Sequence, residues 1–265
     1  LEANVNLTCL DLSNNRIETL DLSPLKKLTS LCVGGNVNMM PEVLEDGQPF
    51  VSGLVSLDIS GCRNLVADLS IFTSLEELHY DSNTGIKDVN ALFRQKRDLR
   101  RLYTGSALKD EDKIYLLTRL EVLDCSGSSV RSLELTYNHE LRSLNVDGCD
   151  MISRLDLSVN QNLTELYCMS KSLTRLELLE GQEIDGINVN LGRHRYISES
   201  VEIVYRPRIE DEPFKRFLLD NYDFDYDSFV SLTEAAMVES IDIPSEKYSG
   251  IVSLHGIEMF SSLKT

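Results

Sequence analysis

The chain carries a short apolar pattern, Leu-x-x-Leu-x-apolar, that recurs at intervals close to 21 residues. The pattern begins at Leu7, Leu28, Leu54, Leu75, Leu99, Leu120, Leu141, Leu163 and Ile184. A period in this range is typical of solenoids, in which each unit is too small to bury its own apolar face and stacks on the next. The sequence therefore predicts an elongated array with a long, regular surface, and surfaces of this kind mostly bind other molecules.

The first half of each unit predicts a short strand. In the unit that begins at Leu141, apolar Leu144 and Val146 alternate with polar Ser143, Asn145 and Asp147. This alternation has the two-residue period of a strand with one buried face. We therefore expect one inward-facing leucine layer per unit.

The second half of each unit predicts a different, outer side. It returns through a second apolar pair, eight residues before the next start, as in Leu133-Glu134-Leu135 and Leu176-Glu177-Leu178. Because no long 3.6-residue period is present, we expect extended or short 3₁₀ segments there, not full helices. Two exceptions have helical patterns, at residues 90–95 and 110–117.

The ninth position of the repeat resembles the leucine-rich repeat family, in which Asn or Cys stands there. The matching residues here are Asn15, Asn36, Cys62, Asn83 and Cys149, and the ladder is broken by Ala107, Ser128, Lys171 and Gly192. In the family this side chain hydrogen-bonds the turning backbone. The resemblance implies a curved α/β solenoid of about nine units over residues 1–205, with a parallel sheet on its concave side and less regularity towards its C-terminal end.

The six cysteines do not form a disulfide pattern. Cys125 and Cys168 share the sixth position two units apart, or about 9–10 Å at the usual strand spacing, which is too far for a disulfide. Since no Cys-x-x-Cys or His-x-x-x-His spacing occurs, metal binding by these thiols is not indicated either. We expect free thiols that mostly fill the core.

A second module is expected over residues 206–237. An edge strand at 201–205 precedes it, and a helix should start at Pro213, with Phe214, Phe217 and Leu218 on one face. After this helix, residues 223–234 resemble the EF-hand calcium loop, with oxygen ligands spaced to surround one cation. The resemblance implies one Ca²⁺ site made by Asp223, Asp225, Asp227, the carbonyl of Phe229, Ser231 and Glu234.

This loop departs from the EF-hand pattern at Ser228, which stands where the family has the glycine of a sharp turn. The alternative is a capping box, in which Ser231 and Glu234 start a helix at residues 233–238 and the aspartates are solvated acids. Residues 238–265 then resemble the start of another repeat, in the arrangement of the N-terminal cap of bacterial surface leucine-rich repeat proteins. We expect the natural protein to extend beyond this chain.

The most distinctive part of the expected concave face is its middle. Glu76, Glu77 and His79 lie in one unit beside Arg100, Arg101 and Tyr103 of the next, and Tyr167 is a second candidate. Tyr and Arg are enriched at the energetic centres of protein interfaces. The alternative is that Glu76 with Arg100 and Glu77 with Arg101 form ordinary cross-strand ion pairs.

The net charge and the lack of catalytic motifs disfavour several classes of function. A net charge of −17 disfavours nucleic acid and anionic membrane surfaces, and no apolar run reaches transmembrane length. Histidines without a neighbouring nucleophile and the lack of a phosphate-binding loop argue against an enzyme. We expect a non-catalytic protein-binding scaffold, which the resemblance implies to be a secreted or bacterial cell-surface protein with a binding or adhesion role. A carbohydrate-binding module and the targeting module of a larger enzyme are the alternatives.

Overall fold

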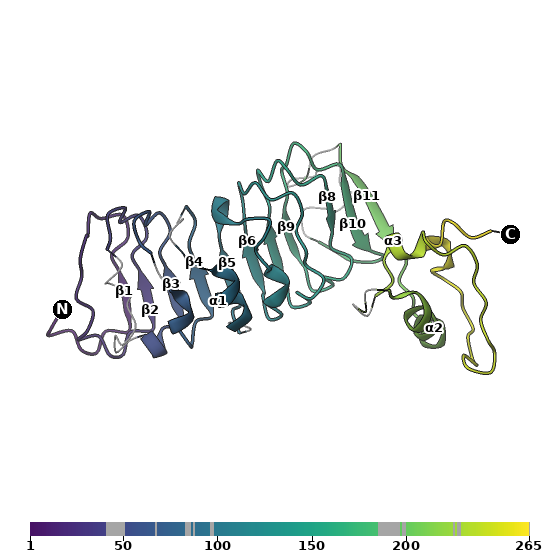
Figure 1. Cartoon of the computed structure of the whole chain (residues 1–265), viewed down its shortest axis with the longest axis horizontal. Helices are drawn as coiled ribbons and strands as arrows, with labels where there is room; N and C mark the ends of the chain where they lie inside the picture. The colour runs from purple at the N-terminus through teal and green to yellow at the C-terminus, as the bar shows by residue number, and fades with distance from the viewer. Residues whose placement is uncertain are drawn as a thin grey trace.

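The computed structural model describes residues 1–40, 51–66, 68–82, 86, 88–95, 98–184, 197, 200–224, 226 and 229–264. It is an elongated array of stacked turns with the N-terminus at one end (Figure 1). A small helical module follows the array at the other end. The chain is a leucine-rich repeat solenoid, as the repeat predicts.

One side of the array is a parallel sheet of eight strands. The strands are β1 Cys9–Asp11, β2 Ser30–Cys32, β3 Ser56–Asp58, β4 Glu77–His79, β5 Arg101–Tyr103, β6 Val122–Asp124, β7 Ser143–Asn145 and β9 Glu165–Tyr167. Each strand pairs in register with the next unit, so that Leu78 lies opposite Leu102 and Leu102 opposite Leu123. The central leucine of β2 to β7 and of β9 is buried in one continuous core, and Leu10 of β1 packs against it.

The outer side combines 3₁₀ turns, one helix and a second sheet, in agreement with the expected extended or 3₁₀ character. Its short elements are η2 Val51–Gly53, η3 Leu69–Ile71, α1 Val89–Gln95 and η5 Ile114–Leu116, while η4 Gly105–Ala107 follows strand β5. Nearer the C-terminal end, β8 Arg154–Asp156, β10 Arg175–Leu179 and β11 Glu202–Arg206 form a three-stranded parallel sheet. The strand expected at 201–205 is therefore present as β11, at the edge of this second sheet.

The helix predicted at residues 110–117 is wrong, because only the single 3₁₀ turn of η5 forms there. A hydrogen bond to another unit uses an amide that a helix would need. The Lys113 N–H donates to the Asn90 side chain at 2.7 Å. The helix predicted at residues 90–95 is confirmed by α1.

The last repeat contact also differs from the predicted register. A unit that starts at Ile184 would place Val189 beside Cys168, yet the structure pairs Cys168 with Ile197. Ile197 is buried in the same core. Most of this ninth unit, including Val189, Asn188 and Gly192, lies outside the described residues, as Asn83 does.

The ninth-position ladder is more continuous than the sequence predicts. The Asn36 amide donates to the carbonyls of Leu12 and Val33 at 3.0 and 2.7 Å, and its oxygen accepts the Ile17 N–H. Thiols replace the amide in two units: Cys62 donates to the Val33 carbonyl, and Cys149 donates to the Cys125 carbonyl.

Two serines extend this ladder. The buried Ser128 hydroxyl contacts the Cys149 sulfur at 3.3 Å, which links it to the ninth-position side chain of the following unit. In the next unit Ser170, one residue before Lys171, donates to the Cys149 carbonyl. All six cysteines are free, and burial raises the pKa of Cys168 to about 12. The four buried thiols are therefore core groups, and those of Cys62, Cys125 and Cys149 also supply weak donors.

A second ladder, which the sequence analysis did not identify, stabilises the return turns. Asn138 donates to the carbonyls of Ile114 and Leu117, and Asn160 donates to those of Leu135 and Asn138. Gln182 continues it to the carbonyls of Leu157 and Asn160. The signal was present in the sequence as three amide residues spaced 22 apart.

We predict that Asn160→Ala destabilises the array. The change removes the side-chain donor of two buried carbonyls, which keep only the N–H groups of Asn138 and Leu141, and the loss of each hydrogen bond costs about 0.5–1.5 kcal/mol. Urea unfolding followed by circular dichroism measures the free energy of unfolding. Asn162→Ala is the matched control, because the Asn162 amide bonds a carbonyl of the preceding unit, His139, at an exposed position. Equal stability of the two variants would contradict a structural ladder.

The C-terminal module has its own small core. Helix α2 Glu212–Tyr222 starts as predicted, and the Asp211 carboxylate caps it by accepting the Phe214 N–H. Helix α3 Leu232–Ala235 is shorter than the predicted 233–238, and η7 Ile257–Met259 follows it. The core side chains are Phe214, Phe217, Leu218, Val230, Ala235, Val238, Tyr248, Met259 and Phe260. Residues 238–264 contain no strand, so their role as a further repeat unit stays a prediction.

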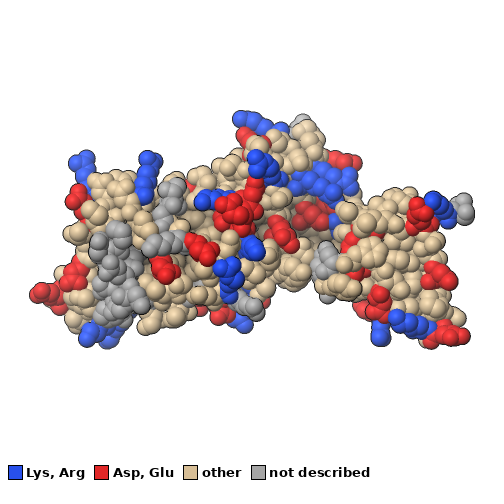
Figure 2. Space-filling model, viewed as in Figure 1, with Lys and Arg blue, Asp and Glu red and all other residues tan. Residues whose placement is uncertain are grey.

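Charged side chains at β8, β10 and β11 join the last turns of the array to this module. Glu177 is fully buried and accepts from Arg175 and Arg206 at 2.8 Å and from Arg154 at 2.5 Å. Arg206, only 2% exposed, also contacts Asp156, and its guanidinium lies 5.3 Å from the centre of the Phe229 ring. Figure 2 shows the resulting concentration of Lys and Arg over these strands.

We predict that Glu177→Ala unfolds the second sheet or weakens the whole array by about 3–5 kcal/mol, because it removes the fully buried carboxylate of Arg206 and leaves only the more exposed Asp156 as its partner. Glu202→Ala is the control, since Glu202 is exposed and pairs only with Arg175 among the described contacts.

Burial by itself would raise the pKa of Glu177, but the bonds from Arg175 and Arg206 outweigh burial and lower it. This contribution is therefore complete above the unfolded-state pKa and is lost as the pH falls through the lower, folded-state pKa. The melting temperature measured from neutral to acidic pH tests this, and an unchanged acid sensitivity in Glu177→Ala would contradict it.

Candidate functional site

The concave face of the sheet is built from the polar positions of each strand. At the fifth position, acids at several strands bond to their own chain: Asp11, Asp58 and Asp124 accept the N–H groups of Ser13, Ser60 and Ser126. These Asx turns end the strands and use one carboxylate oxygen in each case. Most fifth-position acids are therefore structural, which leaves the strands with other residues as candidates for ligand contact.

The middle of the face, at β4 and β5, carries rings instead of acids. The His79 and Tyr103 rings stack with centroids 4.0 Å apart and planes 14° from parallel. His79 Nε2 lies 2.8 Å from Glu77 Oε1, which fixes the imidazole. Burial, followed by the Glu77 charge, raises the pKa of Tyr103, so its hydroxyl stays protonated at neutral pH.

The charges around this aromatic pair are mutually paired. Glu77 accepts from Arg101 at 3.2 Å, and Arg100 lies 3.8 Å from Glu76 and closer to Glu121. The cross-strand ion pairs expected as an alternative are therefore present, and Glu121 is an additional member that the sequence analysis did not name. The Arg101 side chain nevertheless keeps half of its surface exposed. We call the surface of Glu76, Glu77, His79, Arg100, Arg101 and Tyr103 the central patch.

Tyr167, the second predicted site, lies four strands from Tyr103 along the chain and three along the sheet, on the same face. In β9 it is opposite Asn145, whose amide donates to Asp124 at 2.9 Å. Tyr167 is thus separated from the central patch by Asp124 and Asn145. The two aromatic candidates do not form one site.

The acidic segment of the C-terminal module adopts the capping-box geometry. Ser231 Oγ accepts the Glu234 N–H at 3.1 Å, and Glu234 accepts the N–H groups of Ser231 and Phe224 at 2.7 and 2.6 Å. Glu234 is buried, and both of its oxygens are in use. Asp225 and Asp227 lie outside the described residues, whereas Asp223 and Phe229 lie within them.

Geometry of this kind does not fit a preformed calcium cage. A bidentate Glu at the end of the loop needs both oxygens for the cation, and Glu234 gives both to backbone amides. Within the described ranges, no three His, Cys, Asp or Glu side chains converge on a metal position. The calcium site therefore stays a prediction of the sequence.

We predict at most weak calcium binding here, because Glu234 must first release two amides. Calorimetric titration of the whole chain with CaCl₂, and with MgCl₂ as a control for ionic strength, measures it. Glu234→Gln keeps one acceptor oxygen for the cap and removes the carboxylate, so it should abolish any calcium-specific heat. Tight binding that persists in Glu234→Gln would contradict this assignment of ligands.

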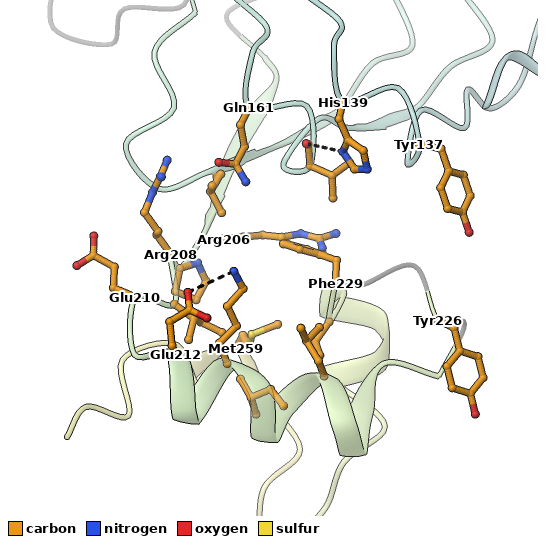
Figure 3. Close-up of a pocket in the computed structure, with 18 residues that line it drawn as sticks. Tyr137, His139, Gln161, Arg206, Arg208, Glu210, Glu212, Tyr226, Phe229 and Met259 are labelled. Carbon is orange, nitrogen blue, oxygen red and sulfur yellow. Dashed lines mark hydrogen bonds and ion pairs between the residues drawn. The ribbon is translucent and has the colours of Figure 1, made fainter. Parts of the chain in front are cut away.

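A cleft that the sequence did not predict lies where the return turns of the array face helix α2 (Figure 3). Its volume is about 660 Å³. His139 and Gln161 project from the turns, and Arg206 crosses the interior above Phe229. Leu218, Leu219, Val230 and Met259 supply an apolar wall, and Arg208, Glu210, Glu212 and Lys215 supply a polar rim. No local pattern could have revealed the cleft, because its residues come from separate elements that meet only in the folded chain.

Among the described residues, no helix combines the length and the apolar character that a membrane crossing requires.

Comparisons with known proteins find similarity at low sequence identity. No protein-family model and no curated protein matches the sequence. Among solved structures, the functional domain of InlJ from Listeria monocytogenes is 20% identical, with 83% of this chain and 63% of that chain covered and a TM-score of 0.41. Internalin C2 from the same species is 19% identical over 77% of this chain and 83% of that chain, with a TM-score of 0.46.

A third solved structure, the internalin InlF of Listeria monocytogenes, is 20% identical over 80% of this chain and 63% of that chain, with a TM-score of 0.39. The chain thus spans just under two thirds of the length of the InlJ and InlF structures.

Proposed function

We propose that this chain is a non-catalytic protein-interaction scaffold whose concave sheet, at the central patch, contacts a protein partner. The observation that carries the proposal is the stacked His79–Tyr103 pair beside the half-exposed Arg101. Aromatic rings held rigidly next to an arginine lose little entropy on binding, and these residue types dominate interface energetics. The sheet around them is regular, so a partner can contact several strands together.

The ion pairs of the central patch indicate which charge a protein partner should carry. Within the central patch each arginine is already balanced by a carboxylate, so a strongly charged partner gains little from it. The chain as a whole carries a net charge of −17, which favours the approach of a basic protein over that of nucleic acid. A partner with a basic rim and an apolar or aromatic centre fits both features.

The sequence resemblance to bacterial surface leucine-rich repeat proteins supports a secreted or surface-attached location. Two alternatives are distinguished by direct observations. A carbohydrate-binding role of the concave sheet requires glycan binding that the central-patch variants abolish. A role as the targeting module of a larger enzyme requires a catalytic domain elsewhere in the natural protein.

We predict that the double variant Arg101→Ala/Tyr103→Ala weakens partner binding by at least about 30-fold, the effect of losing roughly 2 kcal/mol at the centre of an interface. A partner captured from the native surroundings by cross-linking, then produced in pure form, provides the titration. Arg119→Ala/Tyr115→Ala removes the same residue types from the outer side and should leave the affinity unchanged. Retained affinity in the central-patch variant, with its fold intact by circular dichroism, would rule the patch out.

A further inference from the structure

We propose that the cleft between the return turns and helix α2 binds a neutral oligosaccharide. This site is separate from the central patch, because its walls are the outer turns and the C-terminal module and include no concave strand. Its volume of about 660 Å³ falls in the range of about 300–1,000 Å³ that small-ligand pockets occupy. Such pockets commonly form where two structural units meet.

The polar groups at the rim favour a ligand rich in hydroxyls. Glu210 and Glu212 are acceptors only, while Arg208 and Lys215 are donors only, and Gln161 can do both. An anion would face the two carboxylates, and a cation would face the arginine and the lysine. A hydroxyl group donates and accepts in turn, so a sugar with neighbouring hydroxyls satisfies both kinds of partner without carrying a charge of its own.

The apolar part of the cleft suits the other face of a sugar ring. Leu218 and Val230 are almost fully buried and support the wall from behind, while the half-buried Leu219 and Ile209 keep apolar surface open to the cleft. Tyr137 lies at one end of the cleft in Figure 3, and 38% of the residue is exposed. An exposed aromatic ring presents an apolar face and a polar tip, and a pyranose offers C–H groups on one side and hydroxyls at its edge.

Charged contacts between the last strands fix the floor of the cleft. Arg206 is bound to Glu177 and Asp156, so its charge is used in fixing β11 and is not offered to a ligand. The Arg208 backbone N–H and guanidinium Nε both bond Glu180, at 3.2 Å each, which leaves the remaining guanidinium nitrogens for the rim. A rigid site loses little free energy in reorganising on binding.

The experiment uses the whole chain on an array of immobilised oligosaccharides. It includes neutral glucose, mannose, galactose and N-acetylglucosamine trisaccharides and matched uronate- and sialate-containing ones. We expect at least one neutral series to bind, and calorimetry with the strongest trisaccharide then gives its Kd. The Kd should change little with added salt, because no ion pair with the ligand is formed.

Two cleft variants test the location. Gln161→Ala/Lys215→Ala removes two rim groups and should raise the Kd about tenfold or more, since each lost charged or neutral hydrogen bond contributes measurably to affinity. Gln161→Trp should block the cleft sterically. Lys26→Ala is the matched control, because Lys26 has the place of Gln161 in the first return turn. Circular dichroism and melting temperature establish that each variant is folded.

Other outcomes overturn the proposal. Absence of binding to every neutral trisaccharide would do so, as would binding restricted to the acidic ones. Binding that survives Gln161→Trp but is lost in Arg101→Ala/Tyr103→Ala would move carbohydrate recognition to the concave sheet. Binding that is lost in Gln161→Trp but kept in Arg101→Ala/Tyr103→Ala supports the cleft and leaves the proposed protein binding at the central patch untouched. The two proposals therefore succeed or fail separately.

Discussion

Backbone carbonyls at the turns of the solenoid are buried between layers, where water cannot reach them. The architecture depends on hydrogen-bond donors from the protein that pair with these carbonyls. Every unit turns twice, and each turn buries carbonyls between adjacent layers. Two ladders of side chains supply the donors: Asn36, Cys62 and Cys149 in one row and Asn138, Asn160 and Gln182 in the other. Since each of these side chains bonds the carbonyl of the preceding unit, the ladders also set the distance and register between units.

The sequence predicted the repeated layer and its sheet because those depend on local periodicity. Leucines at fixed spacing can be buried in only one way, and each strand from β1 to β7 appears where its unit places it. Predictions failed where a contact between units competes with local preference. Asn90 captures the Lys113 amide and limits residues 110–117 to one turn, and Ile197 takes the position expected for Val189.

The candidate functional sites also divide into those that local sequence patterns predict and those that depend on contacts between distant elements. The concave candidates could be found from the sequence, since strand alternation states which side chains share a face, and His79 indeed stacks on Tyr103. Glu121 could have been found in the same way, because it holds the same second position of its unit as Arg100 does in the unit before it. The acidic segment could be interpreted as a metal loop or as a capping box, and Glu234 adopts the second geometry. The cleft depends on how α2 docks against the return turns, which no local pattern encodes.

The outer strands β8, β10 and β11 have a consequence for the shape of the array. A solenoid bends when its two sides need different room per unit, because helices on the outside take more space than the roughly 4.8 Å between paired strands. The α1 unit has such a bulky outer element, whereas the last units have strands on both sides with the same spacing. The bend should therefore be tightest near the middle and almost vanish towards β11. A rounded partner matches the middle units, while an extended chain could lie flat along the last ones.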